Sequence, residues 1–422
     1  MPSNESNDAQ MWIGAAKQFL LSGNPFRPGA GHMPPHLAGR KEEEGTFKHL
    51  LEQDQILKNM ILTGLRGVGK TVLLDTLRPA AIRERWGWVG TDLSESASIT
   101  EERMATRILT DLAVYTSGLP VSLAPRSVTG FTSADPQAVQ GFLNHQLLLQ
   151  IFNTTPGLIA DKLKQVLEQV WAAMTLQNRP GIVFAYDEAQ NLADHSEKEQ
   201  FPLSLLLDVF QSIQRKGVRF LLVLTGLPTL FSQLVEARTY SERMFHTVFL
   251  SNLTKSESRE AIVVPIQKFP QSLSFTEESI ETIIESTGGY PYFIQFVCRE
   301  VFDIWLQGDK RIIPLDEIIA KLDVDFFSGR WAKVTDRQRD LLRIVALLDH
   351  CDKEFTVQEI VTASKNQITK SFTSSHVNQM LGALQNVGLV YKNRHGRYSF
   401  AVPLLAQFIR RQMEIDRQMT AI

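Results

Sequence analysis

A glycine-rich stretch of eight residues limits most strongly what this chain can fold into. It reads Gly64-Leu-Arg-Gly-Val-Gly-Lys-Thr71, with an apolar run at 60–63 before it and an amphipathic stretch at 71–84 after it. This is the G-x-x-x-x-G-K-T spacing of a phosphate-binding loop between a strand and a helix. Glycines allow backbone N–H groups to turn inward around phosphates, and a helix N-terminus favours negative charge. The flanking strand and helix patterns make a chance turn containing Lys-Thr the weaker interpretation.

The residue types of this loop predict its ligands. Lys70 would reach the β- and γ-phosphates of ATP, and the hydroxyl of Thr71 would ligate Mg²⁺. The candidate ATP-binding residues of the loop are Gly64, Leu65, Arg66, Gly67, Val68, Gly69, Lys70, Thr71 and Val72.

Two adjacent carboxylates follow another strongly apolar run. Residues 182–186 predict a buried strand, and Asp187 and Glu188 come directly after it. Parallel sheets bind their ligands at the carboxyl ends of their strands. We expect Asp187 to bind the same Mg²⁺ and Glu188 to act as the base that polarises the attacking water. Without the glycine-rich loop, an acidic helix cap would be the better interpretation of this pair.

Apolar runs alternate with amphipathic stretches between residues 46 and 252, which predicts parallel βαβ units. The predicted strands cover 60–63, 88–93, 182–186, 220–224 and 248–250, and the predicted helices cover 41–57, 71–84, 99–116, 158–176 and 203–215. Residues 118–156 are rich in Ser, Thr, Pro and Gly and separate the two motifs widely, so they predict an insertion. Residues 1–45 predict an extended strap that leads into this domain.

After residue 252 the strand patterns stop. Helical patterns then predict a separate helical domain at 253–330 and a third domain at 331–422. The helices of the first cover 254–266, 276–287, 291–306 and 314–326, and those of the second cover 335–348, 356–363 and 374–386. A predicted hairpin over 388–400 follows them. Three helices followed by a hairpin is the order of a winged helix-turn-helix.

Together these pieces resemble the AAA+ ATPases, most closely the branch of origin-recognition initiators, STAND-type switch ATPases and transposition regulators. The similarity covers residues 37–300. It rests on Leu37–Glu43, the two motifs above (Walker A and Walker B), Leu224–Pro228, Ser241–Phe245, Leu250–Glu257 and Thr287–Gln295. The resemblance implies the α/β fold class, with a P-loop AAA+ parallel-sheet nucleotide domain, a helical lid domain and a C-terminal winged helix-turn-helix.

The resemblance also implies roles for residues outside the two motifs. Thr225 would be the sensor-1 residue, although a hydroxyl there could equally satisfy a backbone group at the strand end. Arg243 is the best candidate for an arginine finger inserted into a neighbouring subunit, and Arg238 is the second choice; a surface arginine at a helix end is the alternative for Arg243. Pro291 would pack near the adenine. No arginine follows it until Arg299, which favours a slow nucleotide-gated switch over fast constitutive hydrolysis.

The predicted winged helix carries the second functional signal. Residues 331–422 hold 13 Lys and Arg against 8 Asp and Glu, whereas the whole chain has a net charge of −2. Polar residues at the start of the helix at 374–386 would face base edges or phosphates, and cations on the hairpin would contact the DNA backbone. The candidate DNA-binding residues are Ser375, His376, Gln379, Lys392, Arg394 and Arg397. The alternative is a winged helix that docks protein.

Composition indicates the compartment. The two cysteines, Cys298 and Cys351, lack metal-type spacing, which argues for a reducing environment and against a disulfide scaffold or a zinc site. The N-terminus has neither the basic start nor the apolar core of a secretion signal. No apolar run approaches the roughly 20 residues that span a bilayer. We therefore expect a cytoplasmic protein with no membrane partner.

Two hypotheses follow from the sequence. The first is an Mg²⁺-dependent AAA+ switch that binds and hydrolyses ATP and couples nucleotide state to homo-oligomerisation and double-stranded DNA, as an initiator, loader or mobile-element regulator would. The second is a STAND-like signalling or defence ATPase whose winged helix docks protein instead of DNA. Every segment is assigned to the strap, the ATPase, the lid or the winged helix, so either protein would act through a protein partner.

Overall fold

The computed structural model describes residues 23–29, 31–123, 139–267, 269, 275–306, 313–367, 371–394 and 396–420 of the 422-residue chain. Parts of the predicted strap (1–22 and 30) and of the predicted insertion (124–138) lie outside the described residues. The chain separates into two compact units. We call Lys41–Thr63 with Leu73–Phe249 the sheet unit, and Met1–Arg40 with Gly64–Val72 and Leu250–Ile422 the helical unit.

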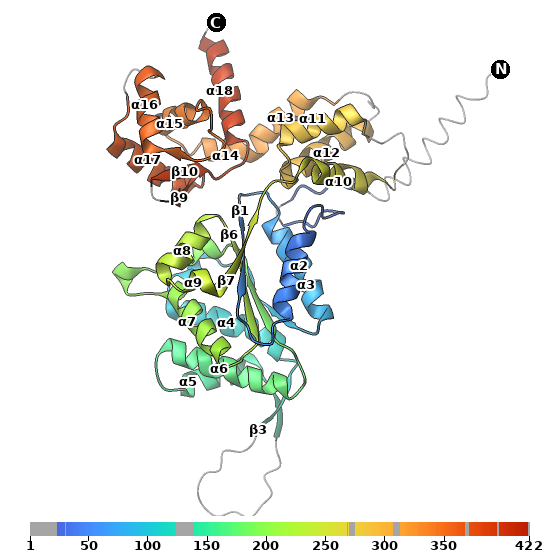
Figure 1. The fold of residues 1–422 in the computed structure, drawn as a ribbon, viewed down its shortest axis with the longest axis vertical. Coiled ribbons are helices and arrows are strands. Elements are labelled where there is room, and N and C mark those ends of the chain that lie inside the picture. Colours follow the sequence, from blue (N-terminus) through green and yellow to red (C-terminus); the bar gives the residue numbers. More distant parts are fainter. Residues whose placement is uncertain are drawn as a thin grey trace, which may run out of the picture. The chain divides into compact units, whose positions relative to one another are not determined.

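The sheet unit is built on a five-stranded sheet in the order β2-β5-β6-β1-β7 (Figure 1). Its strands are β1 (Asn59–Gly64), β2 (Gly87–Val89), β5 (Ile182–Tyr186), β6 (Phe220–Gly226) and β7 (Phe245–Leu250). Strands β2, β5, β6 and β1 pair in parallel. All residues of β1, β5 and β6 are buried, as expected for strands that are covered on both faces. The predicted α/β class with a parallel sheet is confirmed.

Helices cover both faces of this sheet. Buried residues of α4 (Glu101–Thr116), α6 (Ile159–Thr175) and α7 (Pro202–Arg215) form one core with the face that presents Phe184. The Phe184 ring lies edge-on to Phe210, with 5.0 Å between centroids. Helices α2 (Lys41–Leu51) and α3 (Lys70–Arg83) lie on the opposite face, and α8 (Thr229–Ala237) and α9 (Ser241–Met244) follow β6 (Figure 1).

Two predicted elements of the sheet unit were too long. The predicted helix at 41–57 ends at Leu51, because the side-chain oxygen of Gln53 accepts hydrogen bonds from the backbone of Leu57 and Lys58 and turns the chain into β1. The predicted strand at 88–93 ends at Val89, because Gly90 has φ +124° and lies where a Cβ atom would be 1.9 Å from the Ala185 carbonyl oxygen. Only glycine fits that backbone contact.

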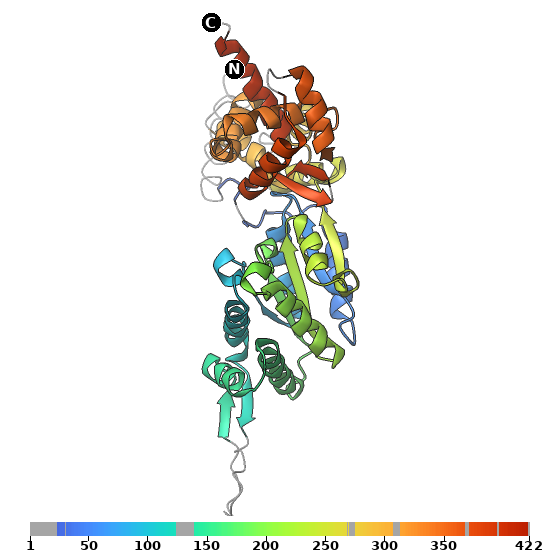
Figure 2. The same ribbon diagram turned by 90° about the vertical axis from the view of Figure 1, so that its left-hand side faces the viewer.

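The segment predicted as an insertion contains regular structure at both of its described ends. Strands β3 (Pro120–Leu123) and β4 (Val139–Phe142) pair in antiparallel fashion, and α5 (His145–Thr154) follows. The pair projects from the sheet unit beyond α5 and α6 (Figure 2). The sequence indicated only an apolar stretch here, because short strands in a Ser- and Gly-rich context carry little periodic signal.

The helical unit contains the predicted lid helices and the predicted C-terminal domain. Its helices are α10 (Lys255–Val263), α11 (Glu277–Thr287), α12 (Pro291–Leu306), α13 (Leu315–Leu322), α14 (Gly329–Trp331), α15 (Asp336–Ala346), α16 (Val357–Gln367), α17 (Ser374–Val387) and α18 (Leu405–Thr420). A π-helical segment, Asp323–Ser328, joins α13 to α14. The antiparallel strands β8 (Phe355–Thr356), β10 (Arg397–Phe400) and β9 (Val390–Arg394) pair in that order. Neither α18 nor β8 was predicted from the sequence.

A single hydrophobic core runs through the helical unit. Phe327, from the π-helical segment, stacks on Phe408 of α18 with 4.9 Å between ring centroids, and Trp331 contacts the same ring edge-on. In the strap, Phe26 is fully buried between Phe275 and Phe302. The lid helices, the C-terminal helices and the strap therefore share buried aromatic contacts.

No helix in the described part of the chain combines the length and apolarity needed to cross a lipid bilayer. Cys298 and Cys351 are both free and buried.

Candidate functional site

The glycine-rich loop lies between β1 and the first residue of α3 and belongs to the helical unit. Gly67 and Gly69 have φ values of +81° and +91°, a left-handed conformation that L-residues with side chains seldom adopt. The ammonium group of Lys70 donates to the carbonyl oxygens of Gly64 and Leu65, both at 3.0 Å. The lysine thus folds back over its own loop, with its charge at the point where the backbone turns.

Three other segments of the helical unit hold this loop in place. Arg40 is buried, and its Nη2 donates to the carbonyl oxygens of Val68 and Ser251, each at 3.0 Å. The backbone N–H of Tyr292, at the start of α12, donates to the Gly67 carbonyl at 3.2 Å. The contacts of Arg40 with backbone carbonyls have no local sequence signature, so no role was predicted for this residue beyond its place in the Leu37–Glu43 resemblance.

The acidic pair lies at the carboxyl end of β5 in the sheet unit. Asp187 is buried, and its Oδ1 accepts a 2.8 Å hydrogen bond from the backbone N–H of Glu188. Backbone hydrogen bonds join Asp187 to Thr91 (3.3 Å) and Leu93 (2.9 Å). Glu188 has φ +52° and ψ +34°, an uncommon conformation for a residue other than glycine. This strained position is a feature often found at functional sites.

Further carboxylates crowd this edge. Burial raises the pKa of Asp75, on α3, and the negative charge of Asp187 raises it further, against a smaller opposing effect of Arg78. Burial also raises the pKa of Asp92, with added contributions from Asp187, Glu188 and Asp75. Carboxylates from separate segments of the sheet unit therefore lie near enough to repel one another at this edge. Such a group of carboxylates suits a bound divalent cation.

No group of three or more His, Cys, Asp or Glu side chains forms a complete metal-ligand set within the described residues. Magnesium does not require one, because it commonly takes one or two protein oxygens and completes its shell with water and phosphate. The Asp187 carboxylate and the Thr71 hydroxyl are donors of this kind. Their chemistry fits magnesium.

Thr225 ends β6, where it is fully buried, and its hydroxyl donates to the Tyr186 carbonyl on β5 at 3.2 Å. This is the backbone contact considered as the alternative to a sensor role. Gln190 links the same strand end to the acidic pair: its amide donates to Glu188, and its oxygen accepts the Leu227 N–H at 3.0 Å. Gln190 was not predicted as a site residue, because a glutamine two residues after an acidic pair carries no recognisable pattern.

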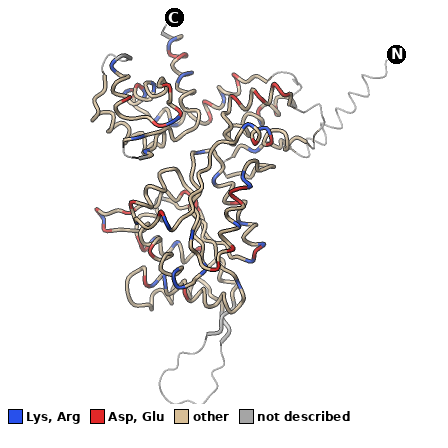
Figure 3. The backbone as a smooth tube through the Cα atoms, viewed as in Figure 1, with Lys and Arg blue, Asp and Glu red and all other residues tan. Residues whose placement is uncertain are grey.

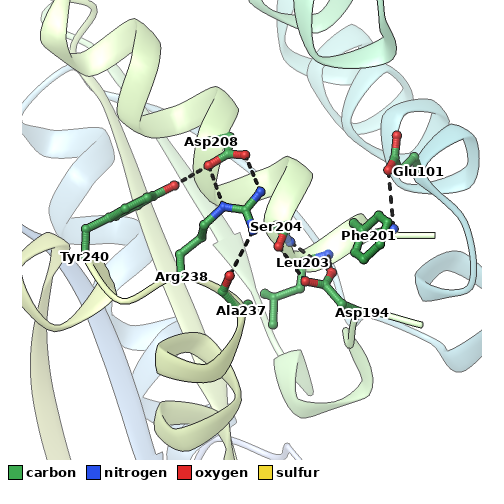
Figure 4. A network of polar contacts seen from close by, with 9 residues as sticks. All are labelled: Glu101, Asp194, Phe201, Leu203, Ser204, Asp208, Ala237, Arg238 and Tyr240. Carbon is green, nitrogen blue, oxygen red and sulfur yellow. Dashed lines mark hydrogen bonds and ion pairs between the residues drawn. The ribbon is translucent and has the colours of Figure 1, made fainter. Parts of the chain in front are cut away.

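The two candidate finger arginines have different surroundings. Arg238 donates two hydrogen bonds to Asp208, at 3.0 and 2.7 Å, and Tyr240 donates to the same carboxylate (Figure 4). Arg243, in α9, is exposed, and its side chain makes no hydrogen bond or ion pair with any residue that the structure describes. Arg238 is already committed to a partner within its own chain, whereas Arg243 is available.

Pro291 is the first residue of α12 and is partly buried. A proline suits this position because the first N–H of a helix has no intrahelical partner.

The candidate DNA-binding residues lie on α17 and the β9–β10 hairpin. Val377, Leu381 and Leu384 of α17 are buried, whereas Ser375, His376 and Gln379 are exposed near its start. On the hairpin, Lys392 is exposed and Arg397 is partly exposed; the side chain of Arg394 lies outside the described residues. Lys and Arg are interspersed with acidic residues in this part of the chain (Figure 3). The exposed face is polar and modestly basic.

Comparison with known proteins adds information on the fold. Residues 324–409 match the family model described as Domain of unknown function (DUF8462). No curated protein matches the chain. The Aeropyrum pernix ORC2 protein in its ADP form is similar, with a TM-score of 0.53 and 15% identity over 92% of this chain and 97% of that chain. Its ADPNP–ADP complexes match with a TM-score of 0.52 and 14% identity over 92% and 98%. This likeness shows a fold of the same kind as that of the ORC2 protein.

Proposed function

We propose that this chain is an AAA+ ATPase that binds ATP with Mg²⁺ and hydrolyses it slowly. The observation that carries the proposal is the complete loop from Gly64 to Thr71, which joins a central parallel strand to a helix in an AAA+ fold. One of the two ORC2 structures is an ADP form and the other holds ADPNP–ADP complexes, which supports a nucleotide as the ligand here.

The residues of the loop have complementary tasks in this proposal. Lys70 exchanges the carbonyls of Gly64 and Leu65 for phosphate oxygens, because a charge-assisted bond to an anion is stronger than one to a neutral carbonyl. The backbone N–H groups of the loop point at the phosphates, and Pro291 packs near the adenine. Thr71 and Asp187 would hold Mg²⁺, which neutralises charge on the phosphates when it is bound.

Glu188 accepts the proton of the attacking water. Its left-handed backbone turns it away from the direction that β5 would continue, and Gln190 fixes its carboxylate. Thr225 lies at the adjacent strand end and bonds the backbone of Tyr186, so we assign it a positioning task beside the nucleotide.

A nucleotide titration tests the site. Lys70→Ala removes the point charge from the loop, and we expect its ATP affinity to fall by about 100-fold or more. The matched control is Lys48→Ala, which removes an exposed lysine from α2. Equal affinity of wild type and Lys70→Ala would refute the site.

The finer proposal is that nucleotide state is coupled to self-assembly and to double-stranded DNA, with 331–422 as a winged helix-turn-helix. The exposed polar start of α17 and the exposed Lys392 support it, because these are the positions that such folds present to DNA. Mobility-shift titrations with ATP, with ADP and without nucleotide test it. We expect ATP-dependent binding that weakens with salt and weakens further in Lys392→Gln.

A second candidate is the STAND-like switch, in which the C-terminal domain docks protein. The core shared by the lid helices and α18 favours it, because a closed switch needs such an interface. DNA binding that is absent in every nucleotide state, together with a stable monomer, would support this candidate.

A further inference from the structure

Two arginines that are far apart in the sequence are linked in the helical unit by a chain of contacts. Arg66 belongs to the glycine-rich loop and Arg330 to α14. Arg330 donates to the Phe326 carbonyl at 2.8 Å, and its guanidinium lies 5.1 Å from the Phe326 ring centroid. The Phe326 ring in turn lies 5.2 Å from that of Tyr292, whose N–H binds the loop at Gly67. This chain of contacts brings Arg330 to the loop.

Both arginines are partly buried, and the described residues supply no counter-ion for their charges. Neither forms an ion pair with a carboxylate in the described part of the chain, and the Nε of Arg66 is buried without a hydrogen-bond partner. Burial lowers the pKa of Arg330, and the positive charge of Arg66 lowers it further, with only Tyr292 acting in the opposite direction. Two partly buried positive charges reduce the free energy of unfolding unless an anion binds to both of them.

The groups nearest to the pair offer only partial compensation. The C-terminal end of α17 faces Arg66: a Cβ atom built on Gly388 would lie 3.8 Å from its Nη2. A helix C-terminus carries about half a negative charge, which is less than the two arginines require. Asp325 is exposed; burial raises the pKa of Tyr292, and the charge of Asp325 raises it further. The remaining imbalance indicates a ligand.

We propose that Arg66 and Arg330 together bind a phosphate group of the nucleotide held by the loop. The inference rests on the proposed function and adds two residues to it. Arg66 lies within the loop itself, which favours a nucleotide phosphate over the phosphate of a nucleic-acid backbone. Two guanidinium groups offer several donors in planar arrays that match phosphate oxygens.

The contact would let the C-terminal helices respond to the nucleotide. Arg330 lies between Phe327 and Trp331 in a short helical segment, and the rings of these neighbours both pack on Phe408 of α18. A phosphate that draws Arg330 towards the loop would therefore shift the side chains that pack on Phe408 in the core of the C-terminal helices. When the phosphate is lost, these side chains return to their earlier positions.

Affinity for ADPNP, measured by equilibrium titration, tests the proposal. We expect Arg330→Gln and Arg66→Gln each to raise the Kd by about ten-fold or more, the typical effect of losing a charged hydrogen bond. Arg330→Lys should lose less affinity for ADPNP than Arg330→Gln, because lysine keeps the positive charge. The control is Arg299→Gln, which removes an exposed arginine of α12 whose ion pair with Asp303 does not involve the loop.

The melting temperature without nucleotide separates a ligand site from a structural role. We expect Arg330→Gln to melt at or above the wild-type temperature, because the substitution relieves repulsion and desolvation. A large drop in the melting temperature of Arg330→Gln, or a Kd for ADPNP equal to that of Arg299→Gln, would overturn the proposal. If Arg330→Gln does not fold, an unchanged Kd in Arg66→Gln overturns it equally.

The outcome also distinguishes this inference from the proposed function. If wild type binds ADPNP no better than Lys70→Ala does, both fail. If Lys70→Ala abolishes binding while the two arginine variants bind as wild type does, only the arginine site fails.

Discussion

At the scale of single residues, the backbone of Glu188 links conformation to chemistry. A glutamate in the left-handed region costs free energy of the order of 1 kcal/mol, which the surrounding hydrogen bonds of Asp187 and Gln190 must offset. The conformation is maintained although glycine would adopt it more easily. A carboxylate held in such a conformation suits a group that acts on water.

Glu188→Gln should retain nucleotide and lose turnover. The amide keeps the shape of the side chain but cannot accept a proton, so we expect hydrolysis to fall by about 10²- to 10⁴-fold while ATP affinity changes little. Phosphate release and nucleotide titration, run on the same preparation, measure the two quantities. The exposed Glu197→Gln serves as the control. Wild-type turnover in Glu188→Gln would remove this residue from the mechanism.

Arg40 is the residue whose replacement should most affect the loop without touching a ligand. Arg40→Gln leaves the carbonyls of Val68 and Ser251 without their buried donor, and we expect a loss of about 3 kcal/mol in unfolding free energy. Denaturant unfolding measures it. The control is Arg27→Gln, which replaces an exposed arginine in the same strap. Its free energy of unfolding should fall by less than about 0.5 kcal/mol. Similar losses in the two variants would contradict the assignment.

At the scale of elements, the segment between α8 and α9 is tied to α7 through Asp208. Burial raises the pKa of Asp208, but hydrogen bonds from Arg238 and Tyr240 lower it more, so that its pKa lies below the ordinary value. The same contacts raise the pKa of Arg238. This connection fixes the backbone from which α9 presents Arg243.

The stabilising effect of Asp208 should depend on pH in a defined direction. Its folded-state pKa is lowered, so its contribution is present above the unfolded value of about 3.9 and is lost as the pH falls through the folded value. We expect Asp208→Asn to melt below wild type at pH 7 and the difference to shrink below about pH 4. Asp54→Asn, at an exposed position of the sheet unit, should show no such trend. A constant difference would show that the charge is not responsible.

At the scale of the whole molecule, we expect the exposed Arg243 to make hydrolysis depend on assembly. Its side chain has no described partner in its own chain, and Arg238 is committed to Asp208. An arginine supplied by a neighbouring subunit accelerates phosphoryl transfer in related systems by about 10³- to 10⁵-fold. Activity per molecule should therefore rise with protein concentration.

Mixing two inactive variants tests this arrangement. Arg243→Ala should bind ATP normally and hydrolyse it slowly, and Lys70→Ala should not bind it. A mixture should recover part of the activity, because some interfaces then pair an intact loop with an intact arginine. The control mixture replaces Arg243→Ala with Glu188→Gln, which lacks the base in the subunit that holds ATP. Absence of recovery, with concentration-independent wild-type activity, would favour the STAND-like monomer.

The loop, the parallel strands and most helices were predictable because their determinants are local. The glycine and lysine spacing at 64–71 specifies a backbone turn and a charge within eight residues, and apolar periodicity reports which side of a helix or strand is buried. The acidic pair was predictable for the same reason, since a carboxylate that follows a buried strand must lie at the sheet edge. The roles of these residues, the domain boundaries and the DNA contacts remain predictions.

Only the tertiary structure decided what depends on contacts between distant segments. Nothing near Arg40 in the sequence specifies the carbonyls that it binds, and nothing near Arg238 shows that Asp208 occupies it. Likewise, nothing near Arg330 in the sequence shows that the ring of Phe326, on which it lies, packs against that of Tyr292 at the glycine-rich loop. Helix α18 and the short β8 depend on the core and the strand partner that they meet in the folded chain. Local sequence thus determined backbone geometry and chemistry, whereas long-range packing determined which charges are paired and which remain available.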